Sequence, residues 1–162
     1  MPDRTSIEVP EPHYTLFNAT RSGQPEVIVV NDALLSFPLA EIFPWHLVVT
    51  LEVADTVENG MPSSTESAIL FQIGDEIEST VLTSRTEHGS QNALFLARST
   101  WNVQRELLFQ VHDPETANQA LQQLLGCRKW EREWSYRMAN DASREAAANV
   151  FQLFPQANGP DA

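Results

Sequence analysis

The histidines are the first residues with which this chain could carry out acid–base chemistry or hold a metal. The four of them, His13, His46, His88 and His112, are spread over the chain, and no two lie at the short spacing of metal ligands. His46 and Glu52 lie six residues apart, on the same face of a predicted strand. A histidine oriented by a carboxylate can act as a general base. We interpret His46 as a histidine on the surface of a sheet, and a catalytic or ligand role is the alternative.

Cys127 is the only cysteine, which excludes an internal disulfide and a cysteine-based zinc cluster. Arg128 and Lys129 follow it, and cations next to a thiol favour the nucleophilic thiolate. Gly126 ends a predicted helix just before it, and the negative end of the helix dipole acts in the opposite direction. Because no histidine is near in the sequence, we interpret Cys127 as a small, partly buried apolar residue.

Two groups of carboxylates could attract a divalent cation. They are Asp75, Glu76 and Glu78 in a predicted helix, and Glu52, Asp55 and Glu58 at the end of a predicted strand. Neither group has the spacing of a known metal-binding loop, so we interpret both as solvated surfaces. The chain also lacks the glycine-rich phosphate loops, the zinc-protease motif and the hydrolase serine motif. We therefore predict no catalytic, cofactor-binding or metal-binding residues.

The composition describes an acidic chain that is long enough to bury a core of its own. Its 162 residues carry 22 acidic and 10 basic side chains, a formal net charge of −12 at pH 7. Residues 1–80 hold 13 of the acids and 2 of the bases, a net charge of −11. This charge opposes binding to nucleic acid or to an anionic membrane. The sequence has no run of 18 apolar residues and no apolar leader segment, so we expect a cytoplasmic protein.

A β-hairpin is expected at the start of the folded region. Tyr14–Phe17 and Val27–Val30 are short β-type runs, and Arg21–Pro25 between them contains a glycine and a proline suited to a turn. The following segment is interrupted by prolines. Its apolar residues are expected to pack over an edge of the core, and they are Leu34, Leu35, Phe37, Leu39, Ile42 and Phe43.

Four further strands and three helices are predicted after this segment. Alternating apolar residues indicate strands at 45–53, 91–99, 103–111 and 130–138. The helices begin after their capping residues. Ser63 with Glu66 forms a capping-box pattern, Asp113 precedes a helix that ends at Gly126, and Asp141 precedes a closing helix.

This order predicts an α+β protein. The core is expected to be a ferredoxin-like βαββαβ antiparallel sheet with two helices on one face, plus an N-terminal β-hairpin and a C-terminal helix. A single domain is expected over residues 13–155, between a flexible arm at 1–12 and a flexible tail at 156–162. The second face of the sheet is open unless the hairpin, the last helix or a second subunit covers it.

The open sheet face is the predicted interaction surface. An RNA-recognition role is excluded because Glu131 and Glu133 on this face would repel phosphate, and the basic and aromatic residues of such a surface are missing. An apolar centre with a polar rim is typical of a protein contact, and a tryptophan at a hairpin tip could anchor one. The residues of this predicted surface are His46, Val48, Trp101, Glu106, Leu108 and Gln110.

The chain resembles a bacterial family known as domain of unknown function 695. The resemblance spans most of residues 13–155 and lies in short motifs: Gly23–Pro25 with Val27–Val30, Leu47–Thr50 with Gly60–Pro62, Ile73–Glu78, Val111–Pro114 and Leu153–Pro155. The family has no agreed catalytic residues, so the resemblance assigns none. In fold and acidity the chain is also similar to the regulator of ribonuclease activity B family, small acidic proteins that bind and inhibit an RNA-degrading enzyme. That similarity implies a partner in RNA processing.

Three functions are consistent with these observations. The leading hypothesis is a small acidic interaction or regulatory module without chemistry of its own, which binds a basic surface on a protein partner. The first alternative is an enzyme or small-molecule-binding protein with a pocket between sheet and helices, using His46 with Glu52 or Arg105. The second alternative is a homodimer formed through the open sheet face. Nucleic acid, membranes and cofactors are not expected partners.

Overall fold

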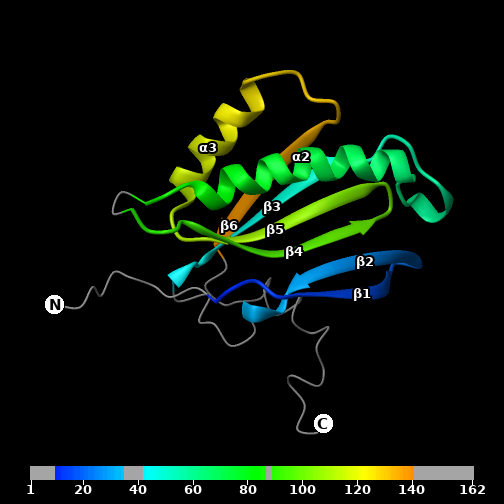
Figure 1. Ribbon diagram of the computed structural model, residues 1–162, viewed down its shortest axis with the longest axis horizontal. Helices are drawn as coiled ribbons and strands as arrows, with labels where there is room; N and C mark the ends of the chain where they lie inside the picture. Colours follow the sequence, from blue (N-terminus) through cyan, green and yellow to red (C-terminus); the bar gives the residue numbers. More distant parts are fainter. Residues whose placement is uncertain (1–9, 35–41, 87–88, 141–162) are drawn as a thin grey trace, which may run out of the picture.

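The computed structural model describes residues 10–34, 42–86 and 89–140. Helices α2 (Ser64–Thr83) and α3 (Pro114–Gly126) lie on one face of a single antiparallel sheet of six strands, in the order β1-β2-β4-β5-β3-β6 (Figure 1). The strands are β1 (Tyr14–Arg21), β2 (Gln24–Asn31), β3 (Trp45–Glu52), β4 (Ala93–Trp101), β5 (Gln104–Val111) and β6 (Trp134–Asn140). The predicted α+β class is confirmed. The closing helix expected from Asp141 lies outside the described residues.

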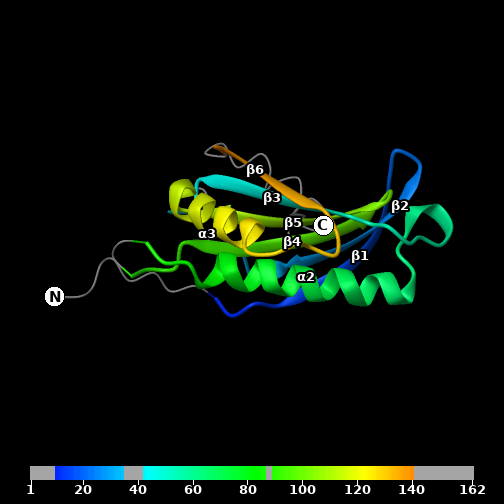
Figure 2. The same cartoon turned by 90° about the horizontal axis from the view of Figure 1, so that it is seen from above.

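The predicted hairpin extends the sheet instead of covering it. Ser22 and Gly23 both have positive φ, 52° and 80°, as the two central residues of a tight hairpin turn require. Strand β2 then pairs along β4, with Val29 opposite Arg98. The hairpin therefore adds two strands at one edge of the sheet, next to β4 (Figures 1 and 2).

The two helices begin where the sequence predicts them. The side chain of Ser63 accepts a hydrogen bond from the backbone of Glu66, which caps α2. Asp113 accepts one from Glu115 at the start of α3, and Pro114 occupies the first turn, where no backbone donor is needed. No described helix has the length and apolar character that crossing a membrane requires.

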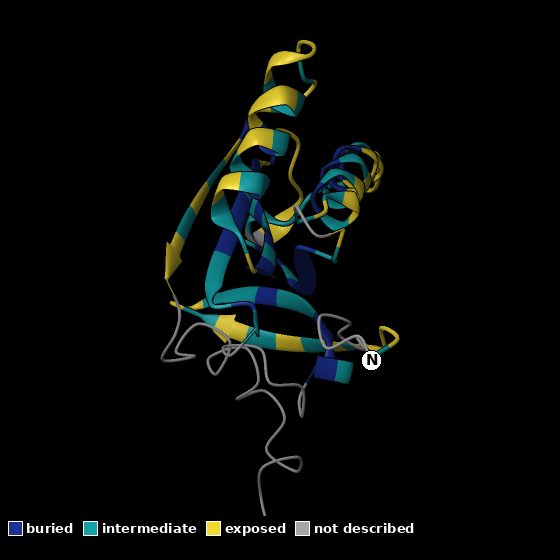
Figure 3. Cartoon of the chain, turned by 90° about the vertical axis from the view of Figure 1, so that its left-hand side faces the viewer, coloured by how far each residue is buried: buried dark blue, intermediate teal, exposed yellow. Residues whose placement is uncertain are grey.

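The main core lies between the sheet and the helices. It is formed by the alternate residues of β3 and β5 that face α2 and α3, together with the inner stripe of α2 (Figure 3). Ile73, Ile77 and Val81 of that stripe are almost completely buried, as their spacing of four residues predicts. Trp134 of β6 closes the core on the far side.

A second, smaller core lies on the opposite face of the sheet. Leu34 and Phe43, from the segment between β2 and β3, pack there against Leu94 and Leu96 of β4. The expectation that this segment covers part of the core is confirmed for its described residues.

Strand β4 contains a bulge that changes which residues face the helices. Phe95 lies opposite Phe109, but Ala97, two residues on, lies opposite Leu108, so Leu96 is an extra residue. Beyond the bulge the alternation is reversed, and Arg98 points to the helix side.

The last strand is shorter than predicted. It begins at Trp134 and not at residue 130. Trp130 instead packs edge-on against Trp134, with ring centres 5.4 Å apart, and its indole nitrogen donates to the carbonyl of Leu125 at the end of α3. This contact holds residues 130–133 as a connection between α3 and β6.

Candidate functional site

The predicted interaction surface lies opposite the helices, and part of it is buried. Gln110 is fully buried, and its side-chain amide donates to the carbonyl of Phe43 at 3.1 Å. Its carbonyl oxygen lies 2.6 Å from Nδ1 of His46. Val48 is also buried. The chain around Phe43 therefore covers this part of the face, and only His46 and Leu108 remain partly exposed there.

The other two residues of the predicted surface are joined through the hairpin. The guanidinium of Arg21 lies 4.0 Å from the centre of the Trp101 ring. It also pairs with Glu26 at 2.6 Å and with Glu106 at 3.6 Å. Ser99 of β4 also donates a hydrogen bond to the carboxylate of Glu26. Trp101 is consequently half-buried against β1 and does not project freely from its turn.

The pocket suggested by His46 with Glu52 or Arg105 is not formed. His46 lies opposite Gln110 and Glu52 lies opposite Gln104, so they occupy opposite ends of β3. Arg105 belongs to the alternate set of β5 residues that faces the helices. The three side chains therefore do not converge.

The acidic residues of α2 are in three different environments. Glu76 pairs with Arg128 at 2.9 Å, Glu78 is partly buried and lies near Arg98, and Asp75 is exposed. Within residues 10–34, 42–86 and 89–140, no three His, Cys, Asp or Glu side chains gather as a metal site requires.

Cys127 is exposed, so the expectation of a partly buried side chain was wrong. Leu124 and Leu125 of the last turn of α3 pack against the main core, but residues 126–129 after them are all exposed. The thiol therefore has no packing role in the core.

A buried ion pair joins the start of α2 to the segment before β6. Glu66 is 1 % exposed, and its carboxylate accepts a hydrogen bond from Nε of Arg132 at 2.6 Å, a second from the same guanidinium, and one from the backbone of Ala54 at 2.7 Å. The hydrogen bonds from Arg132 lower the pKa of Glu66 to about 2. The capping box is thus half formed, because Ser63 caps the helix while Glu66 binds Arg132 instead of the Ser63 backbone.

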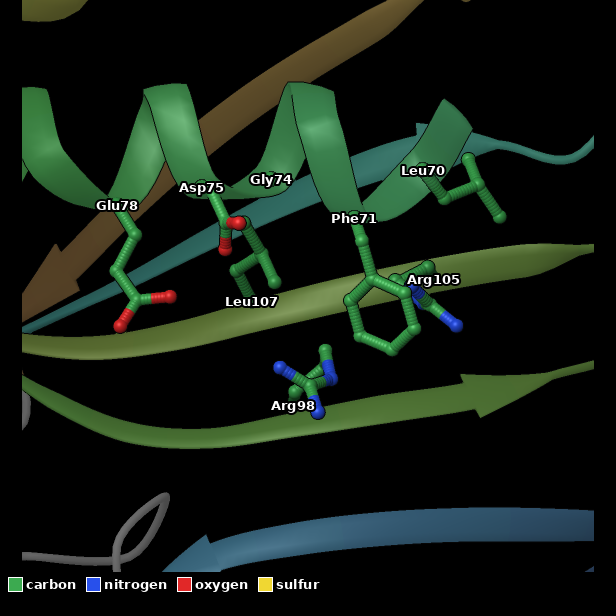
Figure 4. Close-up of a pocket in the computed structure, with 8 residues that line it drawn as sticks. All are labelled: Leu70, Phe71, Gly74, Asp75, Glu78, Arg98, Arg105 and Leu107. Carbon is green, nitrogen blue, oxygen red and sulfur yellow. The ribbon is translucent and has the colours of Figure 1, made fainter. Parts of the chain in front are cut away.

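Two arginines meet between α2 and the sheet. Phe71 reaches from α2 towards β4 and β5 and lies between Arg98 and Arg105 (Figure 4). The guanidinium carbons lie 4.9 Å and 4.6 Å from the ring centre. Asp75 and Glu78 line the same space. We call Arg98 and Arg105 the arginine pair.

Arg105 differs from the other described basic residues in its burial. Arg105 is 4 % exposed, and burial, with Arg98 close by, lowers its pKa to about 10. Burial also raises the pKa of Glu78, an effect that Arg98 opposes. The arrangement can bind an anion at the edges of the two guanidinium groups.

The sequence predicts a role for only one member of the arginine pair, Arg105, as a pocket residue. It predicts none for Arg98 or Phe71. An arginine inside the otherwise apolar run of β4 and a phenylalanine on the polar side of an amphipathic helix were the available signals.

The comparison with protein families gives one match. The model of a family of unknown function, DUF695, matches residues 14–146, which is most of the chain. No curated protein and no solved structure shows significant similarity to this chain. The likeness to the regulator of ribonuclease activity B family therefore remains a prediction, whereas the resemblance to domain of unknown function 695 is confirmed. The chain belongs to the DUF695 family.

Proposed function

We propose that this chain is a non-catalytic interaction module of the cytoplasm that binds a basic surface on a protein partner. Its charge supports the proposal. Four exposed carboxylates, which we call the acidic end, lie at the end of β3, in the loop that follows it and just before β6: Glu52, Asp55, Glu58 and Glu133. The backbone of Glu52 donates to the carbonyl of Glu133 at 3.0 Å, which places Glu133, just before β6, beside the end of β3.

The acidic end contains no ion pair among the described residues, although Asp55 accepts a hydrogen bond from Ser63 at 2.6 Å. None of its four carboxylates forms an ion pair with another described residue, and the nearby Arg132 is already bonded to Glu66. Unpaired surface charge of one sign attracts an oppositely charged partner over about 10 Å at 0.1 M salt. A basic protein surface is the complementary partner.

The order β4-β5-β3-β6 with both helices on one face is the order of strands in a ferredoxin-like core, and we propose that fold class for residues 45–140.

The proposed partner class is an RNA-processing protein. Surfaces that hold RNA are basic because they neutralise phosphates. An acidic module can therefore compete for such a surface.

Capture from an extract of the source cells tests this proposal. Three immobilised proteins are compared at 50 mM and 500 mM salt: the wild type, a variant with the acidic end changed to amides, and a charge-matched control. The control carries amides at four other exposed acids, Glu11, Asp75, Glu115 and Glu131.

We expect proteins with basic surfaces to be retained at low salt by the wild type and the control. They should be lost from the acidic-end variant and at high salt. Retention of the same proteins by all three forms at both salt concentrations would show that the acidic end does not carry the interaction.

A further inference from the structure

Arg105 is a buried cation without an ion-pair partner among the described residues. Its Nε donates to Oγ1 of Thr100 at 3.0 Å, but its Nη1 is completely buried and makes no hydrogen bond. No carboxylate of a described residue lies within 4.0 Å of its guanidinium. Buried charges in proteins are ordinarily paired, and a buried donor without an acceptor is unusual. Within residues 10–34, 42–86 and 89–140, no acceptor meets this donor, so the geometry is compatible with an acceptor supplied by a ligand.

Arg98 lies beside Arg105 and adds a second cation. Arg98 is opposite Leu107, and Arg105 is opposite Thr100, so both point to the helix side from neighbouring strands. The ring of Phe71 stacks on the two guanidinium groups. Because the N–H donors of a guanidinium lie in its plane, stacking on its face leaves its edges able to bind an anion.

The charge of the surroundings favours a singly charged anion. Asp75 and Glu78 line the same space as the arginine pair (Figure 4), so an anion bound there also meets their negative charge. A doubly charged phosphate would be repelled by them more strongly than a carboxylate. A planar carboxylate also matches the fork of a guanidinium.

An uncovered apolar strip continues from Arg98 across the hairpin. Leu16 lies opposite Val29, and Val29 lies opposite Arg98, so the three side chains form one row on the helix side of the sheet. Leu16 is 58 % exposed and Val29 is only partly buried, so neither side chain is fully covered. We call Leu16 and Val29 the apolar strip.

We propose that the arginine pair binds the carboxylate of a small ligand whose apolar body lies on the apolar strip. The space beside Phe71 is about 190 Å³, including open solvent, and does not hold a water molecule while the ring packs on the arginines. Entry of the carboxylate therefore requires the side chain of Phe71, which is 42 % exposed, to turn towards solvent. This site uses different residues from the acidic end, so variants separate the two proposals.

Titration with hexanoate tests the proposal. Hexanoate has one carboxylate and a short apolar chain, and binding is followed through the arginine Nε–H signals in NMR spectra of the full chain. For a ligand of this size we expect a dissociation constant of about 1 mM. Acetate lacks the apolar chain and hexanol lacks the charge, so both should bind at least tenfold more weakly.

Three variants assign the site. Arg105→Met and Arg98→Met should each weaken hexanoate binding at least tenfold, whereas Arg137→Met, at an exposed arginine of β6, should not change it. Arg105→Met should melt at or above the wild-type temperature, because it removes a buried charge that has no partner. Arg98 is only partly buried, so Arg98→Met tests the site in a folded protein if Arg105→Met does not fold.

The source of the carboxylate is distinguished by peptides. A hexapeptide that ends in leucine with a free carboxylate is compared with its C-terminal amide. Binding of the free peptide more tightly than hexanoate assigns the site to peptide ends, and tighter binding of hexanoate assigns it to small acids. Absence of binding by both probes, or equal binding by the wild type and both arginine variants, overturns the proposal.

Discussion

Replacement of Glu66 by glutamine is predicted to lower the free energy of unfolding by about 2 to 3 kcal/mol at pH 7. The carboxylate is 1 % exposed and bound to Arg132, which lowers its pKa from 4.5 to about 2. A shift of this size corresponds to about 3 kcal/mol. Glutamine keeps an oxygen that can accept from the backbone of Ala54, but it leaves Arg132 without its opposite charge.

The effect should depend on pH in a defined direction. Since the pKa of Glu66 is lower in the folded state than in the unfolded chain, the ion pair stabilises the fold above about pH 4.5, and this contribution is lost as the pH falls towards 2. Urea unfolding of wild type and Glu66→Gln, followed by tryptophan fluorescence, should show the full difference at pH 7. At pH 3 the difference should be less than half of that value.

Glu76→Gln is the matched control, because it removes another glutamate of α2 that pairs with an arginine. The side chains of Glu76 and Arg128 are 37 % and 38 % exposed, so this change should cost at most about 1 kcal/mol. Equal losses for Glu66→Gln and Glu76→Gln, or a difference that does not change between pH 7 and pH 3, would refute the reasoning.

Three further predictions concern the backbone and the thiol. Asn102 and Val103 both have positive φ in the β4–β5 turn, and the φ of Val103 is +68°. Val103→Gly gives this turn the Asn-Gly pair that it favours and should raise the free energy of unfolding, measured in urea, by about 1 kcal/mol. A lower free energy of unfolding would contradict the assigned backbone strain at Val103. Gly74→Ala should stabilise α2 by about 0.5 to 1 kcal/mol, because alanine favours the helix and its methyl group would meet Leu107 at an ordinary contact distance of 3.8 Å. Thermal unfolding measures this effect, and destabilisation would show that the space beside Gly74 is already filled. Cys127 is exposed and should react with a thiol reagent in the native protein as fast as in the unfolded chain, whereas protection in the native state would place it in a contact.

The order of strands and helices was predictable because it depends on local patterns. The capping residues Ser63 and Asp113 lie directly before helices whose apolar residues recur at helical spacing. The alternation in β3 likewise assigned Leu47, Val49 and Leu51 to the helix side, where they are buried. These signals lie within one element and do not depend on its neighbours.

The arginine pair was not predictable in the same way, because it depends on a bulge. Continued alternation from Leu94 and Leu96 would place Arg98 on the face opposite the helices. The extra residue in β4 reverses the alternation and turns Arg98 towards Phe71. A bulge is set by pairing with a distant strand, so the sequence of β4 alone does not reveal it.

The position of the hairpin also lay beyond local reasoning. Its strands were predicted, but pairing of Val29 with Arg98 joins segments about 70 residues apart. Placement at the sheet edge leaves Leu16 exposed, whereas a hairpin folded over the sheet would have buried one of its faces.

The association rate constant of a captured basic partner, measured with the purified chain at increasing salt, tests the central claim most directly. If the acidic end steers the encounter, the wild-type rate constant should fall at least tenfold between 50 mM and 500 mM salt. The acidic-end variant should associate slowly at both concentrations. A rate constant that is independent of salt and equal in the two proteins would contradict the proposal that charge at Glu52, Asp55, Glu58 and Glu133 directs binding.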